Sequence, residues 1–174
     1  FLKAAEIEAN KLDVKGLLSG EMEMTATVGS AKGRRASGKF RITQGKLYKL
    51  PVLMGFLHVG YLTLPSESAF HAAEVDYYLE DDKLVFPEIH LTGSALSMVG
   101  AGNLDLDNKR LRFTFLTGPP RKLPRLAGLA DLIEALASHL TAVRVTGTVS
   151  HPRIRTVPIR QPGKTLEELY NPEK

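Results

Sequence analysis

Residues 93–115 read GSALSMVGAGNLDLDNKRLRFTF, and this stretch decides the fold. Apolar and polar side chains alternate almost without interruption on both sides of a short acidic turn at residues 107–109. A period of two is typical of strands that bury one face, so the stretch predicts an antiparallel pair of strands. Gly100 and Gly102 in the first arm predict a bend or a bulge. The apolar positions of the two arms are Leu96, Met98, Leu104, Leu106, Leu111, Phe113 and Phe115.

The preceding residues 70–93, FHAAEVDYYLEDDKLVFPEIHLTG, predict a second hairpin by the same pattern. Residues 80–83 are charged and rich in aspartate, which is typical of a tight turn. Pro87 interrupts the second arm. Because proline has no N–H to donate to a neighbouring strand, it predicts an edge strand or a bulge at this position. The apolar face of the first arm consists of Ala73, Val75, Tyr77 and Leu79.

Strand patterns continue on both sides of these hairpins. Upstream, Met22 and Met24 alternate with glutamates, and Gln44-Gly45 is the expected turn between two further strands. Downstream, residues 141–159 again alternate. Their apolar positions are Val143, Val145 and Val149, and the polar positions between them are Arg144, Thr146 and Thr148. Strands at roughly ten-residue spacing with short turns favour an antiparallel sheet.

Helical spacing of apolar residues occurs at residues 50–62 and, more clearly, at residues 126–140. The chain is therefore predicted to be mainly β (α+β), with a curved antiparallel sheet or half-barrel groove and one or two short amphipathic helices. We expect a single domain over residues 1–160, followed by a polar tail over residues 161–174. In that tail, Thr165 is a candidate cap for one helical turn.

Composition limits the classes of function. The chain has 174 residues, 43% of them hydrophobic and 24% charged, as in ordinary globular domains. It lacks cysteine, which excludes disulfides, thiolate zinc sites and cysteine nucleophiles. The net charge of +4 arises in residues 119–174, which hold 9 basic and 5 acidic side chains. This excess indicates either contact with anionic lipid or an ordinary solvated surface.

Residues with catalytic or metal-binding chemistry are sparse. The histidines, which are His58, His71, His90, His139 and His151, do not have metal-ligand spacing. The acidic groups at residues 80–82 and 105–108 fall at predicted turns, and the second lacks the glycine and distal glutamate of a calcium-binding loop. No serine lies in a G-x-S-x-G motif. We therefore expect a protein that is not an enzyme and that has no metal and no cofactor. The 7% aromatic content without tryptophan argues against nucleic acid as a partner.

The order of these features over residues 16–160 resembles the AsmA-like C-terminal domain family. GLLSGEMEMTATVG and SGKFRITQGKLYKLPVLMGFL are similar to the family's glycine-led strand, turn and short helix. Residues 70–115 are similar to its central run of strands, and LAGLADLIEALASHLTAVRVTGTVSHPRIR is similar to its closing helix and strand. The GRRASG loop and the tail after residue 160 do not match the family pattern.

The resemblance implies a bacterial cell-envelope protein in the periplasm, anchored in the inner membrane by an N-terminal helix. It implies a bridge-like lipid transfer function, in which phospholipid moves along an apolar β-groove toward the outer membrane. An envelope protein is the partner under the alternative hypothesis of an interaction domain. The family contributes no catalytic residues. Phe1 is not an initiating methionine, so we expect this chain to be the C-terminal portion of a longer protein, with the anchor upstream.

The candidate lipid-groove residues follow from the alternation in three of the predicted strands. They are Val75, Tyr77, Leu79, Leu111, Phe113, Phe115, Val143 and Val145. Two interpretations stay open at this point. The residues line an open groove for acyl chains, or they meet the helix at residues 126–140 in the closed core of a structural or protein-interaction domain.

Overall fold

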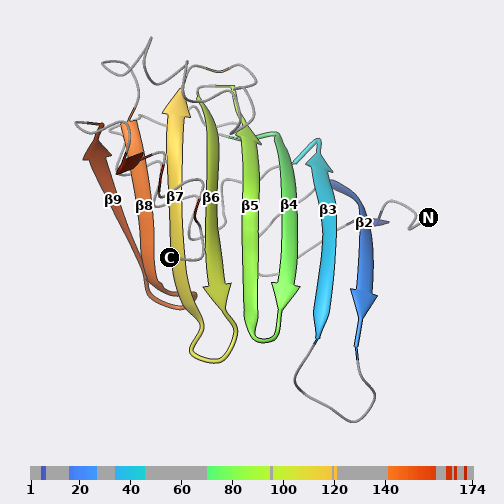
Figure 1. Ribbon diagram of the computed structural model, residues 1–174. Helices are drawn as coiled ribbons and strands as arrows, with labels where there is room; N and C mark the ends of the chain where they lie inside the picture. Colours follow the sequence, from blue (N-terminus) through green and yellow to red (C-terminus); the bar gives the residue numbers. More distant parts are fainter. Residues whose placement is uncertain are drawn as a thin grey trace.

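The computed structural model shows one antiparallel sheet of nine strands in the order in which they occur along the chain (Figure 1). The strands are β1 (Ala5–Glu6), β2 (Leu17–Thr25), β3 (Arg35–Thr43), β4 (Ala72–Glu80), β5 (Lys83–Thr92), β6 (Ser97–Asp105), β7 (Arg110–Gly118), β8 (Thr141–Thr148) and β9 (Pro152–Pro158). The structure describes residues 5–6, 16–26, 34–45, 70–94, 96–118, 120, 141–159, 164–165, 167 and 171.

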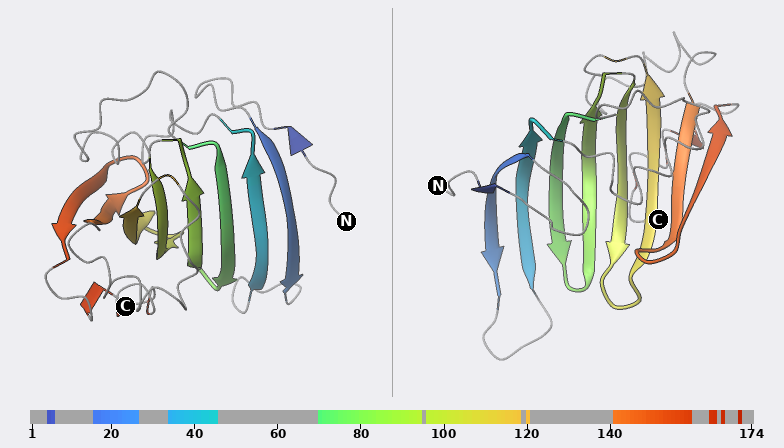
Figure 2. Two further views of the ribbon diagram at one scale, coloured as in Figure 1. Left: turned by 90° about the horizontal axis from the view of Figure 1, so that it is seen from above. Right: turned by 180° about the vertical axis from the view of Figure 1, so that it is seen from behind.

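The mainly β prediction is confirmed, because each strand pairs with the strand before and after it in the sequence. The sheet twists so that β8 and β9 turn out of the plane of β2–β5 (Figure 2). The predicted helices at residues 50–62 and 126–140 lie outside the described residues. So does the second strand expected after Gln44-Gly45, although Gln44 has the positive φ, 53°, of a turn residue.

The two predicted hairpins have the predicted turns. β4 and β5 are joined by Asp81 and Asp82, and Asp81 has φ of 52°. β6 and β7 are joined by residues 106–109. Leu106 was expected to continue the first arm, but it belongs to the turn and is 42% exposed. Val149 was likewise expected in a strand; it follows the end of β8 and is 51% exposed.

Pro87 lies in a bulge rather than at a sheet edge. β5 is an interior strand that pairs with β4 on one side and β6 on the other. The register shifts between Asp76 and Tyr78 on β4, and between Phe86 and Ile89 on β5. The extra residue leaves proline outside the regular hydrogen-bond ladder, which resolves the two alternatives that the sequence left open.

Gly100 and Gly102 do not bulge against β7, because β6 and β7 pair residue for residue through Gly100↔Phe115 and Gly102↔Phe113. The irregularity predicted for β6 lies instead on its other neighbour, β5. The glycines make room for aromatic rings. A Cβ on Gly102 would clash with Cδ1 of Phe113, and a Cβ on Gly100 would clash with Cδ1 of Phe115.

The described hydrophobic core lies on β4–β8. One buried cluster consists of Phe70, Ala73, Val75, Ile89, Leu91, Met98, Phe115, Val143 and Val145. A second set projects to the opposite side of β5–β8 and is equally buried: Val85, Val99, Ala101, Leu116 and Ala142. The strands at the centre of the sheet are therefore covered on both faces. By contrast, every residue of β2 except Leu18 is exposed.

Candidate functional site

One face of the sheet is apolar from β2 to β9. Directly opposite residues of antiparallel strands project to the same face, so the register assigns each side chain. One row across the sheet reads Gly20, Phe40, Val75, Ile89, Gly100, Phe115, Val143 and Thr156. Together with the parallel rows, this defines the apolar face, whose larger members are Leu18, Met22, Met24, Phe40, Ile42, Val75, Tyr77, Leu79, Leu84, Phe86, Ile89, Leu91, Met98, Leu104, Leu111, Phe113, Phe115, Val143, Val145 and Ile154.

The apolar face is open at one side of the sheet. Met22 and Met24 on β2 are 58% and 57% exposed, although both are large hydrophobic side chains. The neighbouring side chains Phe40 of β3 and Tyr77 of β4 are half-buried. Their rings pack at a centroid distance of 6.0 Å, and the Tyr77 hydroxyl lies above Gly38. The exposed Met22 and Met24 thus extend the surface formed by the rings of Phe40 and Tyr77, and are not isolated apolar side chains.

All eight groove residues predicted from the sequence lie on the apolar face. Four of them are buried and four are half-buried. Val75, Phe115, Val143 and Val145 are buried and belong to the core cluster. The other four, Tyr77, Leu79, Leu111 and Phe113, are half-buried. These four lie toward the end of the sheet that carries the β4–β5 and β6–β7 turns.

An aromatic stack connects the core to this end of the face. The ring of Phe113 lies 5.5 Å from that of Phe86 and 6.1 Å from that of Phe115, measured between centroids. Such pairs contribute about 0.5–1.5 kcal/mol beyond the apolar area that they bury. Phe113 therefore has a structural role as well as a position on the apolar face.

The sequence interpretation did not include Met22, Met24, Phe40 and Phe86 among the groove candidates. The alternation of Met22 and Met24 with glutamates was visible, and it placed them on one face of a strand. What separates them from the predicted residues is exposure, which depends on the segments that cover each strand and not on the strand's own pattern.

The opposite, polar face carries rows of paired charges on β3 and β4. Nη2 of Arg35 lies 3.2 Å from Oε1 of Glu80, and Nη2 of Arg41 lies 3.2 Å from Oε1 of Glu74. Nζ of Lys39 lies 3.7 Å from Oδ2 of Asp76. These cross-strand pairs are partly exposed, so each contributes at most about 1 kcal/mol. They fix which face of β3 and β4 meets water.

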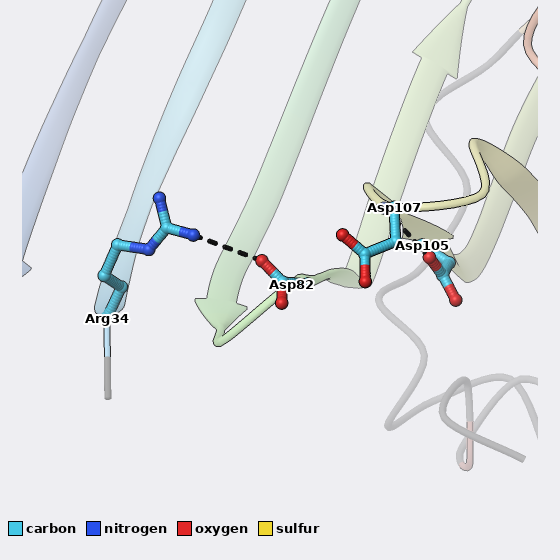
Figure 3. Close-up of polar contacts among 4 residues, drawn as sticks. All are labelled: Arg34, Asp82, Asp105 and Asp107. Carbon is cyan, nitrogen blue, oxygen red and sulfur yellow. Dashed lines mark hydrogen bonds and ion pairs between the residues drawn. The ribbon is translucent and has the colours of Figure 1, made fainter. Parts of the chain in front are cut away.

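The acidic turns make structural contacts (Figure 3). Nη2 of Arg34 lies 3.2 Å from Oδ1 of Asp82, which ties the start of β3 to the β4–β5 turn. Oδ1 of Asp105 accepts hydrogen bonds from the backbone N–H groups of Asp107 and Asn108, at 3.0 and 3.1 Å. The Asn108 backbone N–H is the main reason that the pKa of Asp105 lies below its ordinary value of 3.8.

The described residues contain no group of three or more metal-ligating side chains. His71 and His151 are exposed, whereas His90 is buried, and its Nε2 lies 2.8 Å from Oε1 of Glu88 beside the β5 bulge. His58 and His139 lie outside the described residues.

No known protein family, curated protein or solved structure matches this chain. Within the described part of the chain, no helix has the length and apolar character needed to cross a membrane.

Proposed function

We propose that this domain is a non-enzymatic lipid-binding and lipid-transport module of the bacterial cell envelope. In this proposal the apolar face serves as a groove that carries phospholipid acyl chains toward the outer membrane. The observation that carries the proposal is the exposure of Met22 and Met24, 58% and 57%, at the open side of an apolar face that spans β2–β9. Large hydrophobic side chains left exposed in a continuous apolar surface mark sites for apolar ligands.

The dimensions and energies suit an acyl chain. A nine-residue strand such as β2 is about 30 Å long at about 3.3 Å per residue. An acyl tail spans half of a bilayer's hydrocarbon core, about 15 Å. Each buried methylene contributes about 0.8 kcal/mol, so a tail held against the apolar face avoids a penalty on the order of 10 kcal/mol. Continuity of the face matters because every break exposes methylenes to water.

The resemblance to AsmA-like C-terminal domains supports the same function and supplies the setting. In that setting the domain lies in the periplasm, the full-length protein is anchored in the inner membrane upstream of this chain, and the ligand is a phospholipid. The proposal requires no metal, no cofactor and no catalytic residue.

The test is a charge placed on the open apolar face. The double variant Met22→Glu/Met24→Glu should bind at least tenfold less phospholipid, because a carboxylate beside an acyl chain loses its hydration. Native mass spectrometry of the purified protein measures copurified phospholipid, and titration with a fluorescent acyl lipid gives the affinity. Both methionines are more than half exposed, so the substitutions leave the core intact.

The matched control is Ser19→Glu/Thr25→Glu. It adds the same charge to the same strand on the polar face, opposite Arg41 and Arg35. The control should keep the lipid affinity of the unmodified protein. Equal lipid binding by both double variants, or no copurified phospholipid with the unmodified protein, would contradict the proposal.

The alternative function is that of a structural or protein-interaction domain of the envelope with a closed core. One observation favours it: β1 pairs only with Leu17 and Leu18, so in the described residues the outer edge of β2 from Gly20 onward has no strand beside it. An edge of this kind accepts a partner strand by β-augmentation. Capture of a protein partner, lost when Met24→Pro removes an N–H from the open edge of β2 and unaffected by Met22→Glu/Met24→Glu, would favour this function.

A further inference from the structure

The polar face carries paired opposite charges on β3 and β4, but its charged side chains on β7–β9 are all positive. On β3 and β4 the cations face carboxylates, as in Arg35–Glu80 and Arg41–Glu74. Strands β7, β8 and β9 contain no aspartate or glutamate. All of their charged residues are arginines: Arg110, Arg112, Arg144, Arg153 and Arg155.

The register gathers four of these arginines into one array. Arg144 of β8 is directly opposite Arg155 of β9. In the next row, Arg112 of β7 and Arg153 of β9 flank Thr146 of β8. Directly opposite side chains on neighbouring strands have Cβ atoms about 5 Å apart. The four arginines therefore lie on two adjoining rows of three neighbouring strands. We call these four residues the arginine array.

The arginine array is accessible. Arg112, Arg153 and Arg155 are exposed, and Arg144 is half-buried. Arg112, Arg144 and Thr146 line a cavity of about 470 Å³, to which Lys164 adds a further cation. Among the described residues of this lining, Glu167 is the only acidic side chain. The cavity is a recess next to the arginine array that an anionic group can enter.

Like charges placed directly opposite each other destabilise a sheet. An anion that binds above Arg144 and Arg155 reduces this cost. The guanidinium group binds phosphate oxygens through two parallel hydrogen bonds, which lysine cannot do. An array composed of arginine alone thus fits phosphate groups.

The array lacks the features of a protein-binding surface. Stable protein interfaces centre on buried aromatic or large apolar anchors. The exposed positions of the polar face on β7–β9 are instead arginines and Thr146. A layer of phosphate-bearing headgroups requires no such anchor.

We propose that the arginine array binds the phosphate groups of anionic phospholipids and holds this part of the sheet against a membrane surface. This site lies on the face opposite to the proposed acyl-chain groove, so it does not depend on that proposal. The membrane site positions the domain, whereas the apolar face contacts lipid tails.

The test is sedimentation with vesicles of phosphatidylcholine, with and without phosphatidylglycerol, at low ionic strength. The unmodified protein should sediment with the anionic vesicles, and added salt should release it. Arg153→Gln/Arg155→Gln should bind them about thirtyfold more weakly, since each basic side chain near an anionic surface contributes about fivefold. The same variant should unfold at an equal or higher urea concentration, because it removes repulsion. This measurement separates lost binding from lost folding.

The matched control is Arg35→Gln/Arg41→Gln, which removes two arginines from the same face of the sheet. These arginines are already paired with Glu80 and Glu74, so vesicle affinity should fall less than threefold. Equal losses in the two variants would mean that binding follows net charge, and would overturn the proposed site. So would failure of the unmodified protein to bind anionic vesicles.

Two further measurements exclude other ligands. Met22→Glu/Met24→Glu should retain the binding to anionic vesicles that depends on headgroup charge, because it alters the other face. Polyglutamate and inorganic phosphate are the competing probes. Binding of polyglutamate through Arg153 and Arg155 without binding of vesicles would assign the array to an acidic protein, and binding of inorganic phosphate alone would assign it to a soluble anion. Either result would overturn the membrane proposal.

Discussion

Gly100 and Gly102 determine how two aromatic rings lie on the apolar face. Both glycines are buried in β6, and the rings of Phe115 and Phe113 cover the positions where their side chains would be. Rings that lie flat over glycine keep the face smooth and shield the backbone of the neighbouring strand. These glycines were visible in the sequence, but their purpose became clear only from the cross-strand register.

Substitution of Gly102→Ala should lower the free energy of unfolding by about 1–3 kcal/mol, because the new methyl group overpacks the space occupied by Phe113. Urea unfolding measures the change. In a Phe113→Ala background the penalty should be smaller, since the ring has been removed. A Gly102→Ala protein as stable as the original would contradict the close approach of ring and glycine.

Asp105 makes the β6–β7 turn sensitive to acid. Its pKa is lowered by the backbone N–H of Asn108 first, then by the Asn108 side chain, the Asp107 N–H and the charge of Arg110. A carboxyl with a lowered pKa stabilises the folded state above its ordinary value of 3.8, and this contribution is lost as the pH falls through the lower folded-state value.

Asp105→Asn should therefore be less stable than the original protein at neutral pH, and the difference should shrink as the pH is lowered below 3.8. Urea unfolding at a series of pH values measures it. The comparison variant is Asp107→Asn, whose carboxylate accepts neither of the two turn hydrogen bonds made by Asp105. A difference between Asp105→Asn and the original protein that stays constant with pH would refute the assignment.

At the scale of elements, the β5 bulge preserves the apolar face on both sides of Pro87. Leu84 and Phe86 precede the bulge and project to the apolar face, as do Ile89 and Leu91 after it. The spacing of three between Phe86 and Ile89 breaks the period of two, and the bulge absorbs the extra residue. The sequence named an edge or a bulge at this proline. The structure distinguishes the two, because β6 pairs with β5 on the side opposite to β4, which makes β5 an interior strand.

Deletion of Pro87 should give a protein that still unfolds cooperatively, because Phe86 and Ile89 then follow a regular alternation. Deletion of Thr114 from β7, a strand that pairs without any register shift, should abolish cooperative unfolding. This deletion moves the buried side chains that follow residue 114 in β7 to the opposite face of the sheet. Thermal unfolding followed by circular dichroism compares the two. Similar loss of structure in both deletions would show that the bulge has another role.

Alternation of polar and apolar residues was enough to predict the hairpins, but not the ends of all their strands. Leu106 and Val149 continue the apolar pattern, yet each lies beyond the last residue of its strand. Asp105 and Asn108 organise the first turn through hydrogen bonds, and Gly147 has φ of 92° just before the second. Local turn chemistry ends a strand even where the apolar pattern continues.

Across the whole molecule, burial falls from the centre of the sheet toward β2. Met98 and Val99 of β6, on opposite faces, are 1% and 0% exposed. Met22 of β2 is 58% exposed. Alternation in β2 and in β7 looks alike in the sequence, so the sequence alone located the apolar face without showing which part of it is open. Exposure depends on tertiary contacts, which a strand's own residues do not encode.

Amide hydrogens of β2 should exchange fastest among the strands from β2 to β8, and those of β6 slowest, because local opening needs less energy where few apolar contacts are broken. Hydrogen–deuterium exchange with mass spectrometry measures this order. Addition of phospholipid should slow exchange most in β2 and β3. Uniform exchange along the sheet, or protection by lipid confined to β7–β9, would argue against the open apolar face as the acyl-chain site.

The order of the strands also bears on how the polypeptide reaches its native state. Each strand bonds to its immediate predecessor and successor in the sequence. Strands joined by short turns, as in the pairs β4–β5, β6–β7 and β8–β9, make their contacts quickly because little loop entropy is lost. The sheet can therefore form one hairpin at a time while the chain is being synthesised. Strands can also be added or lost at the β2 side during evolution without a change in the pairing of the other strands.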